Sequence, residues 1–235
     1  MLTNTSRMAA LALACAAAFG FSVQANAAVR HAHGTSRANG ETAHWHGTRV
    51  TGPNGGQAGR GVRTVSDPAN GTITRTRGTN ITGPNGATAH HGSNTVYGSD
   101  GTVTHTGNTS MTGANGGTAT GQNTYTKNAD GSSTYTRTTS GTTAQGTDFS
   151  HTSDWSKSAD GTRSGSVQNT VTGANGGSYS GSVTAGNGTA TRNTTATTKN
   201  GDTYTGTTTY TKGQGVTHTG TCTDAQGNSI TCPQH

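Results

Sequence analysis

This sequence of 235 residues has little of what a globular core or a catalytic centre requires. Hydrophobic residues make up 26%, aromatic residues 5% and charged residues 10%, and there are three cysteines and four prolines. So small an apolar fraction excludes a dense core. Because the charged fraction is also small, the composition is not that of a self-repelling disordered chain either, although a mostly disordered chain stays an open alternative.

Residue types used in catalysis are present, but they are not arranged for it. No serine, histidine or aspartate occupies a strained nucleophile turn or a position beside an obvious base, and Glu41 is the only glutamate. We therefore expect a protein that is not an enzyme and that uses no cofactor.

Long apolar runs are found only near the N-terminus. Arg7 is followed by an apolar run over residues 8–21, and residues 25–27, Ala-Asn-Ala, offer a small-residue cleavage site. The pattern predicts a signal peptide over residues 1–27 and export to the periplasm, the cell surface or the medium. Since no later stretch is apolar enough to cross a bilayer, we expect no transmembrane insertion of the mature chain.

The two cysteines of the predicted mature chain, Cys222 and Cys232, form an even pair. In an oxidising compartment such a pair predicts a disulfide. The two positions are symmetric about Gly227, so we expect them to face each other across a terminal hairpin. Closing so small a loop stabilises by about 2–3 kcal/mol at most. A redox role is disfavoured because the chain has no Cys-x-x-Cys motif.

The abundant residues are glycine, at 38 positions, with threonine, serine and asparagine. They are arranged in four blocks of 30 residues over residues 71–190. The block-opening turn positions are Gly71, Asp100, Gly101, Asp130, Gly131, Asp160 and Gly161. The mid-block turn positions are Asn85, Gly86, Asn115, Gly116, Asn175 and Gly176, with Gln145 and Gly146 in the third block. A fixed period of this size indicates a repeat architecture, in which each unit packs on its neighbours.

The residues at these positions are typical of tight turns. Asn-Gly and Asp-Gly dipeptides accept positive φ, and residues 84–86, Pro-Asn-Gly, suit a type I turn followed by glycine in the left-handed conformation. An alternative is that Asp100, Asp130 and Asp160 form a row of calcium ligands. Each block offers a single carboxylate there, whereas calcium requires roughly six to eight oxygen ligands, so turn chemistry is favoured.

Between the turns, residues alternate with period two, as in residues 72–77, Thr-Ile-Thr-Arg-Thr-Arg. Such alternation predicts strands, each up to about 11 residues long. Threonine and serine are expected on one face of these strands, while Ile, Val, Met, Tyr, Arg and His share the other. The sequence therefore predicts an all-β protein built from tandem two-strand repeats of about 30 residues.

The rest of the chain is less regular. Residues 28–39 are predicted to be a flexible polar arm, and residues 40–70 a degenerate first repeat with one extra residue. After residue 190 the 30-residue step is lost, and residues 191–235 are expected to form irregular strands that end in the disulfide-stapled hairpin. Atypical terminal units are common in repeat proteins.

Two arrangements fit this pattern, an antiparallel meander and an elongated, stacked, solenoid-like sheet. In a stack, equivalent residues of successive blocks lie about 4.7–4.8 Å apart, so Asn85, Asn115, Gln145 and Asn175 would form an amide ladder. The same geometry would align the block-opening aspartates, but their repulsion at a hydrated turn is small, about 1 kcal/mol or less per pair. The amide ladder therefore favours the stack.

Two histidine pairs stand out near the N-terminus, His31 with His33 and His44 with His46. Strand residues i and i+2 share a face, so each pair is able to hold a transition metal through neutral imidazoles. The alternative is that these histidines are only solvated, because no thiol or carboxylate joins them at a ligand spacing.

Seven arginines over residues 30–77 outnumber Glu41 and Asp67 in the same segment. Such a basic region would attract a polyanion, either extracellular DNA or polysaccharide, by charge and without base recognition. A solubilising role is the simpler alternative.

Recurring Thr-x-Thr motifs resemble the threonine arrays of repeat antifreeze proteins, which need a flat and regular face. The change of step after residue 190 and a drift of the threonine runs in register argue against ice binding.

The function that these features favour is that of a secreted or cell-surface structural protein, self-associating or adhesive, in an extracellular matrix or fibre. Its mechanism would be edge pairing, in which unpaired backbone groups of a terminal strand bind another copy. In class the chain resembles the curlin-type functional amyloids, also exported and rich in Gly, Asn and paired strands, although their repeats are shorter and carry regularly spaced Gln and Asn. The alternative is a periplasmic or surface module that binds a polyanion or a transition metal through the basic, His-containing N-terminal region.

Overall fold

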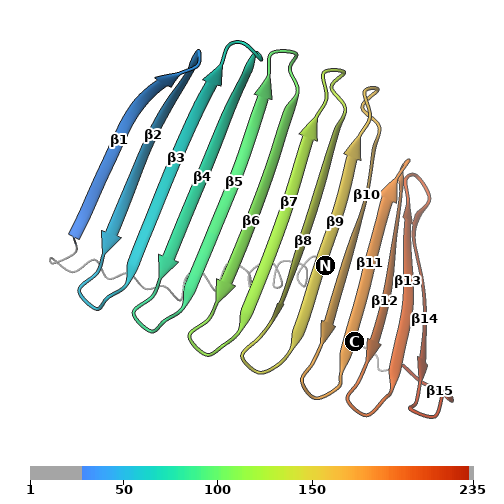
Figure 1. The fold of residues 1–235 in the computed structure, drawn as a ribbon. Coiled ribbons are helices and arrows are strands. Elements are labelled where there is room, and N and C mark those ends of the chain that lie inside the picture. The colour runs from blue at the N-terminus through green and yellow to red at the C-terminus, as the bar shows by residue number, and fades with distance from the viewer. Residues whose placement is uncertain (1–27, 233–235) are drawn as a thin grey trace.

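The computed structural model describes residues 28–232, which form a single β-sheet with its connecting turns and a short segment after the last strand (Figure 1). The predicted signal peptide, residues 1–27, lies outside the described residues. Within the described part, the chain contains no helix long and apolar enough to cross a membrane.

Fifteen strands follow one another in the sheet in chain order, and each is antiparallel to its neighbours. The strands are β1 (Ala28–Ala38), β2 (Glu41–Thr51), β3 (Gln57–Asp67), β4 (Thr72–Thr82), β5 (Thr88–Gly98), β6 (Val103–Thr112), β7 (Thr118–Lys127), β8 (Ser133–Thr142), β9 (Asp148–Lys157), β10 (Arg163–Thr172), β11 (Ser178–Gly186), β12 (Thr189–Thr197), β13 (Thr203–Thr211), β14 (Gly215–Thr223) and β15 (Ser229–Ile230). The prediction of an all-β fold made of two-strand repeats is confirmed.

Of the two arrangements that fit the sequence, the protein adopts the meander. Equivalent residues of successive blocks lie two strands apart, so the amide ladder expected for a stack does not form. The reason lies in the connections. They are short enough to reverse the chain and place each strand antiparallel beside the last, whereas parallel pairing needs a longer crossover.

Most turns share one geometry, a type I turn followed by glycine in the left-handed conformation. In the β4–β5 turn, Gly86 N–H donates to the Gly83 carbonyl at 3.1 Å and Gly86 has φ +83°. The block-opening turns are built in the same way, since Gly101 N–H donates to the Gly98 carbonyl at 3.1 Å and Gly101 has φ +84°. This loop class needs one left-handed residue, which explains the recurring glycine.

Residues 28–38, expected to be a flexible arm, instead form strand β1, which pairs with β2 along its whole length. The turn that joins them is Asn39-Gly40, with φ +53° and +80°. Two successive positive φ values define the two-residue turn that best matches strand twist, so this dipeptide folds the arm back onto the sheet.

The strands shorten along the chain, from 11 residues in β1–β5 to 10 in β6–β10 and 9 in β11–β14. The departure from the 30-residue period after residue 190 therefore comes from shorter strands and from shorter turns, such as the two-residue turn at Asn187-Gly188. The alternation of faces continues through it unbroken.

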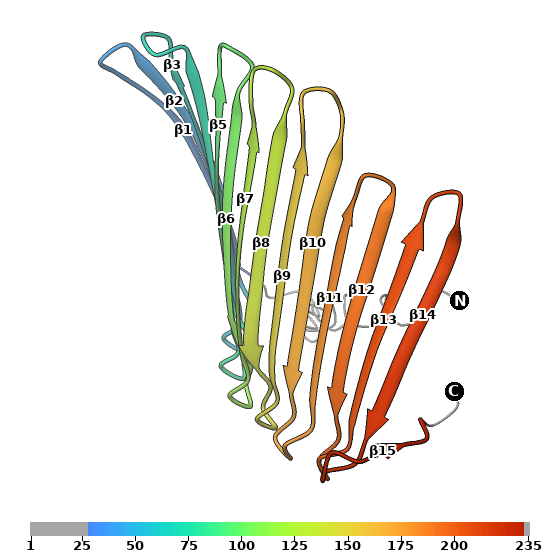
Figure 2. The ribbon, with the colours of Figure 1, turned by 90° about the vertical axis from the view of Figure 1, so that its right-hand side faces the viewer.

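The sheet is one layer thick (Figure 2), and its strands fan out only gradually from β1 to β14. Among the described residues, the buried apolar side chains are Ala43, Val62, Ala87 and Cys222. With so little apolar burial, stability depends on the backbone ladder and on cross-strand side-chain pairs.

Aromatic rings compensate for the missing second layer by lying against glycines. A Cβ atom added at Gly165 would overlap the indole of Trp155, and one added at Gly34 would overlap the indole of Trp45. Gly206 is covered in the same way by the ring of Tyr204. These rings shield backbone that a glycine leaves bare, a known way of stabilising glycine in sheets.

Candidate functional site

The strand register divides the side chains between two faces, because directly paired residues point to the same side of a sheet. We call the face that carries Arg77, Arg137 and Arg192 the cationic face and the opposite one the hydroxyl face. Both extend across the whole sheet, so the sheet offers two chemically different surfaces.

The cationic face carries no Asp or Glu over strands β1–β14. Its basic residues are Arg37, Arg60, Arg75, Arg77, Lys127, Arg137, Lys157, Arg163 and Arg192. The acidic residues in strands, Glu41, Asp67, Asp148 and Asp154, belong to the hydroxyl face. The cationic face thus carries charge of one sign only, whereas the hydroxyl face carries all four acidic strand residues together with Arg30, Arg49 and Arg63.

The hydroxyl face is almost uniform from β6 to β14. Its strand positions there are Thr, Ser, Asn or Gln, except for Asp148, Asp154, Gly186 and Gly215. We expected the threonine runs to change face where the repeat length changes after residue 190, and this expectation is wrong. The difference in repeat length lies in the strand ends and turns, so the threonine runs stay on one face. In β1–β5 the separation is less complete, since Trp45 and Arg63 lie on this face.

The four histidines proposed as metal ligands all lie on the cationic face, on β1 and β2. His33 is directly opposite His46. His31 and His44 are hydrogen bonded through Nδ1 to the hydroxyls of Thr48, at 3.1 Å, and Thr35, at 2.9 Å. Among the described residues, no three His, Cys, Asp or Glu side chains come together as a metal-binding group. The sheet aligns the imidazoles but does not gather them around one point.

The N-terminal arginines, expected to form one basic region, are split between the two faces. Arg30 and Arg49 are opposite each other on the hydroxyl face, which Arg63 shares. Arg60 and Arg77 lie on the cationic face. Adjacent arginines in the sequence do not therefore form a single patch.

The block-opening aspartates act on their own turns. Asp100 Oδ1 accepts hydrogen bonds from Thr102, at 3.0 Å from the backbone N–H and 2.7 Å from the hydroxyl. Asp130 and Asp160 accept the backbone N–H two residues on, at 2.8 and 2.9 Å. The side chain and backbone N–H of Ser132 at Asp130, and the backbone N–H and side chain of Thr102 and Thr162 at Asp100 and Asp160, hydrogen bond to the charged form and lower the pKa of each carboxyl below its ordinary value of 3.8. The carboxylates are thus used in holding the turn.

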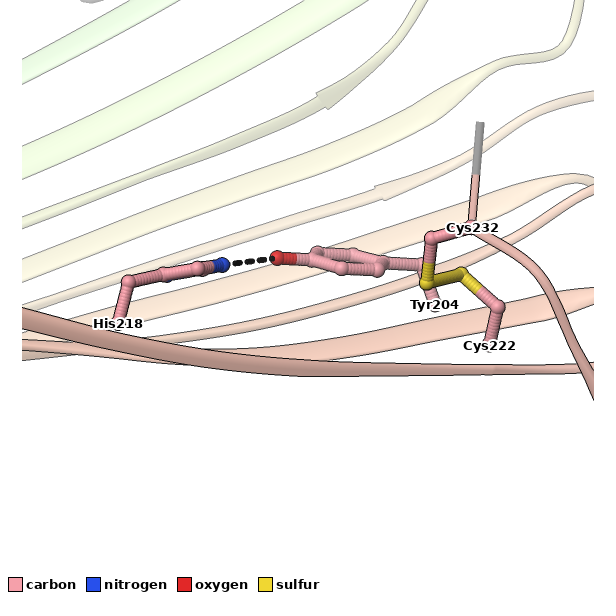
Figure 3. Close-up of a disulfide and its surroundings, with 4 residues drawn as sticks. All are labelled: Tyr204, His218, Cys222 and Cys232. Atoms are coloured by element: carbon pink, nitrogen blue, oxygen red, sulfur yellow. Dashed lines mark hydrogen bonds between the residues drawn. A yellow bond between two sulfur atoms is a disulfide. The ribbon is translucent and has the colours of Figure 1, made fainter. Parts of the chain in front are cut away.

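The predicted disulfide between Cys222 and Cys232 is present, with Cα atoms 5.3 Å apart (Figure 3). The expected reason for it is wrong, because the residue opposite Cys222 is Ile230. The last turn has Gly227 in the left-handed position, with its N–H bonded to the Asp224 carbonyl at 2.9 Å, and this turn pairs Cys222 with the residue two positions before Cys232. Cys232 then lies beyond β15 and closes the bridge from there.

An aromatic strip on the cationic face was not foreseen from the sequence. Tyr125, Tyr135 and Trp155 are direct neighbours across β7, β8 and β9. Each is followed two residues later, on the same face, by a cation: Lys127, Arg137 and Lys157. The signal that could have revealed the strip is the recurring pattern aromatic-x-cation, at residues 125–127, 135–137 and 155–157.

The two edges of the sheet are unlike each other. In the described sheet, β1 has a strand on one side only, so its 11-residue outer edge is open. At the other end, β15 pairs with β14 only at Cys222 and Thr223, which leaves residues 215–221 of β14 open. Unpaired backbone groups at such edges are able to bind a further strand.

Comparisons with protein-family models, with curated proteins and with solved structures find no match to this chain.

Proposed function

We propose that the protein is an exported structural component that assembles edge to edge with further copies into long sheets at the cell surface or in the extracellular matrix. The observation that carries the proposal is the 11-residue open edge of β1 on a sheet with almost no buried core. A disulfide, typical of proteins in oxidising compartments, supports export.

The assembly we infer is head to tail, with β1 of one copy against β14 of the next. β14 runs antiparallel to β13 as every strand does to its neighbour, so a β1 strand added beside it would continue the meander. Directly paired residues form rows across the sheet, and one such row runs from His33 on β1 to His218 on β14. If this row continues from one copy to the next, His33 of the next copy lies opposite His218. A contact between two different surfaces leaves one free edge at each end of the assembly, so repeated addition produces a fibre unless the rotation between copies closes a ring.

Two features restrain the assembly. β1 carries Arg30, His31, His33 and Arg37, and charged or polar side chains on an edge strand discourage indiscriminate pairing. The last hairpin covers the Cys222 end of β14, so an added strand can pair only along residues 215–221. These restraints favour one register over many.

Cysteine crosslinking tests this register. In the proposed contact, positions 33 and 218 of adjacent copies would lie about 4.5–5.5 Å apart, which suits a disulfide. Oxidation of the His33→Cys, His218→Cys protein, residues 28–235, should produce a ladder of covalent oligomers on a non-reducing gel. Each single variant should stop at the dimer. The matched control is Ala32→Cys with His218→Cys, since Ala32 lies on the opposite face.

The outcome that would reject the proposal is a mature protein that stays monomeric at high concentration for days, without thioflavin signal, while the double variant forms no ladder. A ladder of equal strength from the Ala32→Cys control would reject the pairing of His33 with His218 but not the edge-to-edge assembly.

A second candidate function, polyanion binding, is supported by the acid-free cationic face rather than by the N-terminal arginines as a group. The transition-metal alternative has less support, since the four histidines are not gathered in one metal-binding group.

A further inference from the structure

The aromatic strip combines two features that are separate elsewhere on the sheet, stacking surfaces and unopposed cations. Tyr125, Tyr135 and Trp155 occupy one row on three successive strands, whose spacing is about 4.7–4.9 Å. The row therefore crosses the strands, and a linear polymer lying over it would meet one ring per strand.

The ring of Trp155 has one side against the sheet and the other in solvent. Its indole lies over the backbone of Gly165, yet 42% of the residue is exposed. A ring held in this way offers a rigid flat face, so a planar group can stack on it without ordering a mobile side chain first. Tyr125 and Tyr135 are half-buried beside it.

Cations flank the row on both sides. Lys127, Lys157 and Arg163 lie toward the block-opening turns, with Lys157 directly opposite Arg163. Arg137 lies on the other side of the row.

Asp154, beside Trp155 in the chain, lies on the opposite face, and the carboxylates beyond these cations are in the turns, at Asp130 and Asp160. Each already accepts a backbone hydrogen bond, from Ser132 and Thr162. The four flanking cations exceed these two carboxylates, so the surface around the rings is net positive.

We propose that this part of the cationic face binds single-stranded DNA, with bases stacked on the aromatic strip and phosphates on the flanking cations. Stacking needs bases that are not already paired and stacked, which favours a single strand over a duplex. The binding is not sequence-specific, because every base has a flat face. It goes beyond the structural role proposed above and does not require self-association.

Charge alone would not single out this part of the sheet. An acidic polysaccharide held only by charge would bind equally well over the arginines of β3 and β4, such as Arg60, Arg75 and Arg77, where no aromatic row is present. A polymer with bases can use both the rings and the cations, whereas an acidic polysaccharide needs the cations alone. The test below therefore compares the two ligands.

The two tryptophans provide a matched pair for that test. Trp155 and Trp45 are 42% and 43% exposed, and both lie over a glycine, but Trp45 is on the hydroxyl face. The probe is a fluorescently labelled oligothymidine, titrated with residues 28–235 by anisotropy. Trp155→Ala should weaken binding roughly 5- to 150-fold, the range found for loss of one stacking ring. Trp45→Ala should leave it unchanged.

Two further measurements do not depend on removing the ring. In Trp45→Phe protein, where Trp155 is the only tryptophan, oligothymidine should quench the fluorescence, and in Trp155→Phe protein it should not. If four phosphates are neutralised, log K should fall with log salt at a slope of about −3, and Lys127→Gln should reduce that slope by about 0.7. Arg49→Gln, on the hydroxyl face, should not change it.

The proposal is overturned if the two alanine variants behave alike while both keep the native circular dichroism spectrum, or if Trp155 is not quenched. It is also overturned if heparin, which has charge but no bases, binds as tightly as oligothymidine and Trp155→Ala does not affect either ligand. That result would identify a surface that binds polyanions by charge alone.

Discussion

We predict that removing the disulfide at the end of the sheet does not unfold the other strands. Replacing both Cys222 and Cys232 by serine should release β15 and the turn before it, residues 224–232, while β1–β14 stay paired. The reason is topological, since β15 pairs only with β14, through two residue pairs, and the turn before it adds only a contact between Ala225 and Gly201 of the β12–β13 turn. In a single-layer meander, loss of the last strand removes no support from the strands before it.

The magnitudes support local release. The bridge spans a sequence separation of 10, for which loop closure contributes about 2.7 kcal/mol. Two ladder pairs and two turn hydrogen bonds, at about 0.5–1.5 kcal/mol each, contribute an amount comparable with the bridge, so the bridge supplies a large share of what holds this segment.

Hydrogen exchange measured by mass spectrometry checks this prediction. Peptides that cover residues 222–232 should lose protection in the double serine variant, while those from β2 to β12 keep theirs. The same change uncovers the rest of the β14 edge, so the variant should also assemble faster than the unmodified protein under the conditions of the crosslinking experiment. Faster assembly is expected because a longer edge offers more backbone pairs to an incoming β1.

The result that would refute this reasoning is loss of protection throughout the sheet, or loss of the β-sheet circular dichroism signal, when the bridge is removed. Either would mean that the last hairpin supports strands it does not contact. Unchanged exchange at residues 222–232 would show that the hairpin is stable without the bridge.

Two further predictions concern stability. Gly165→Ala should lower the free energy of unfolding by about 1–3 kcal/mol, because its Cβ would overlap the Trp155 ring. The control is Gly78→Ala, which has nothing within 4 Å of the added Cβ and should be neutral or stabilising. Both are measured by urea unfolding followed by circular dichroism, and equal effects would contradict the packing of the ring on the glycine. The lowered pKa values of Asp100, Asp130 and Asp160 mean that the stability these carboxylates contribute is complete above their ordinary pKa of 3.8 and is lost as pH falls through the lower folded values. The thermal midpoint should therefore be steady near neutral pH and fall below about pH 4, and replacing all three by asparagine should flatten that fall; an acid limb that the triple variant leaves unchanged would assign it to other groups.

What the sequence by itself determined about this protein is local. The turn positions follow from residues that tolerate a left-handed backbone, as at Gly86 and Gly101, and the strands follow from period-two alternation. Alternation also predicts which side chains share a face within one strand, so the separation of threonine from arginine and histidine could be foreseen. Each of these features depends on a few neighbouring residues.

Only the tertiary structure decided what depends on pairing between strands. The choice of meander over stack, the pairing of β1 and the two-residue shift that leaves Cys222 opposite Ile230 are set by loop geometry and cross-strand register. The aromatic strip has the same origin, since Tyr135 and Trp155 are 20 residues apart in the chain and become neighbours only through the β8–β9 register. A shift of one residue in register moves a side chain to the other face, so surfaces built from several strands cannot be read from any one of them.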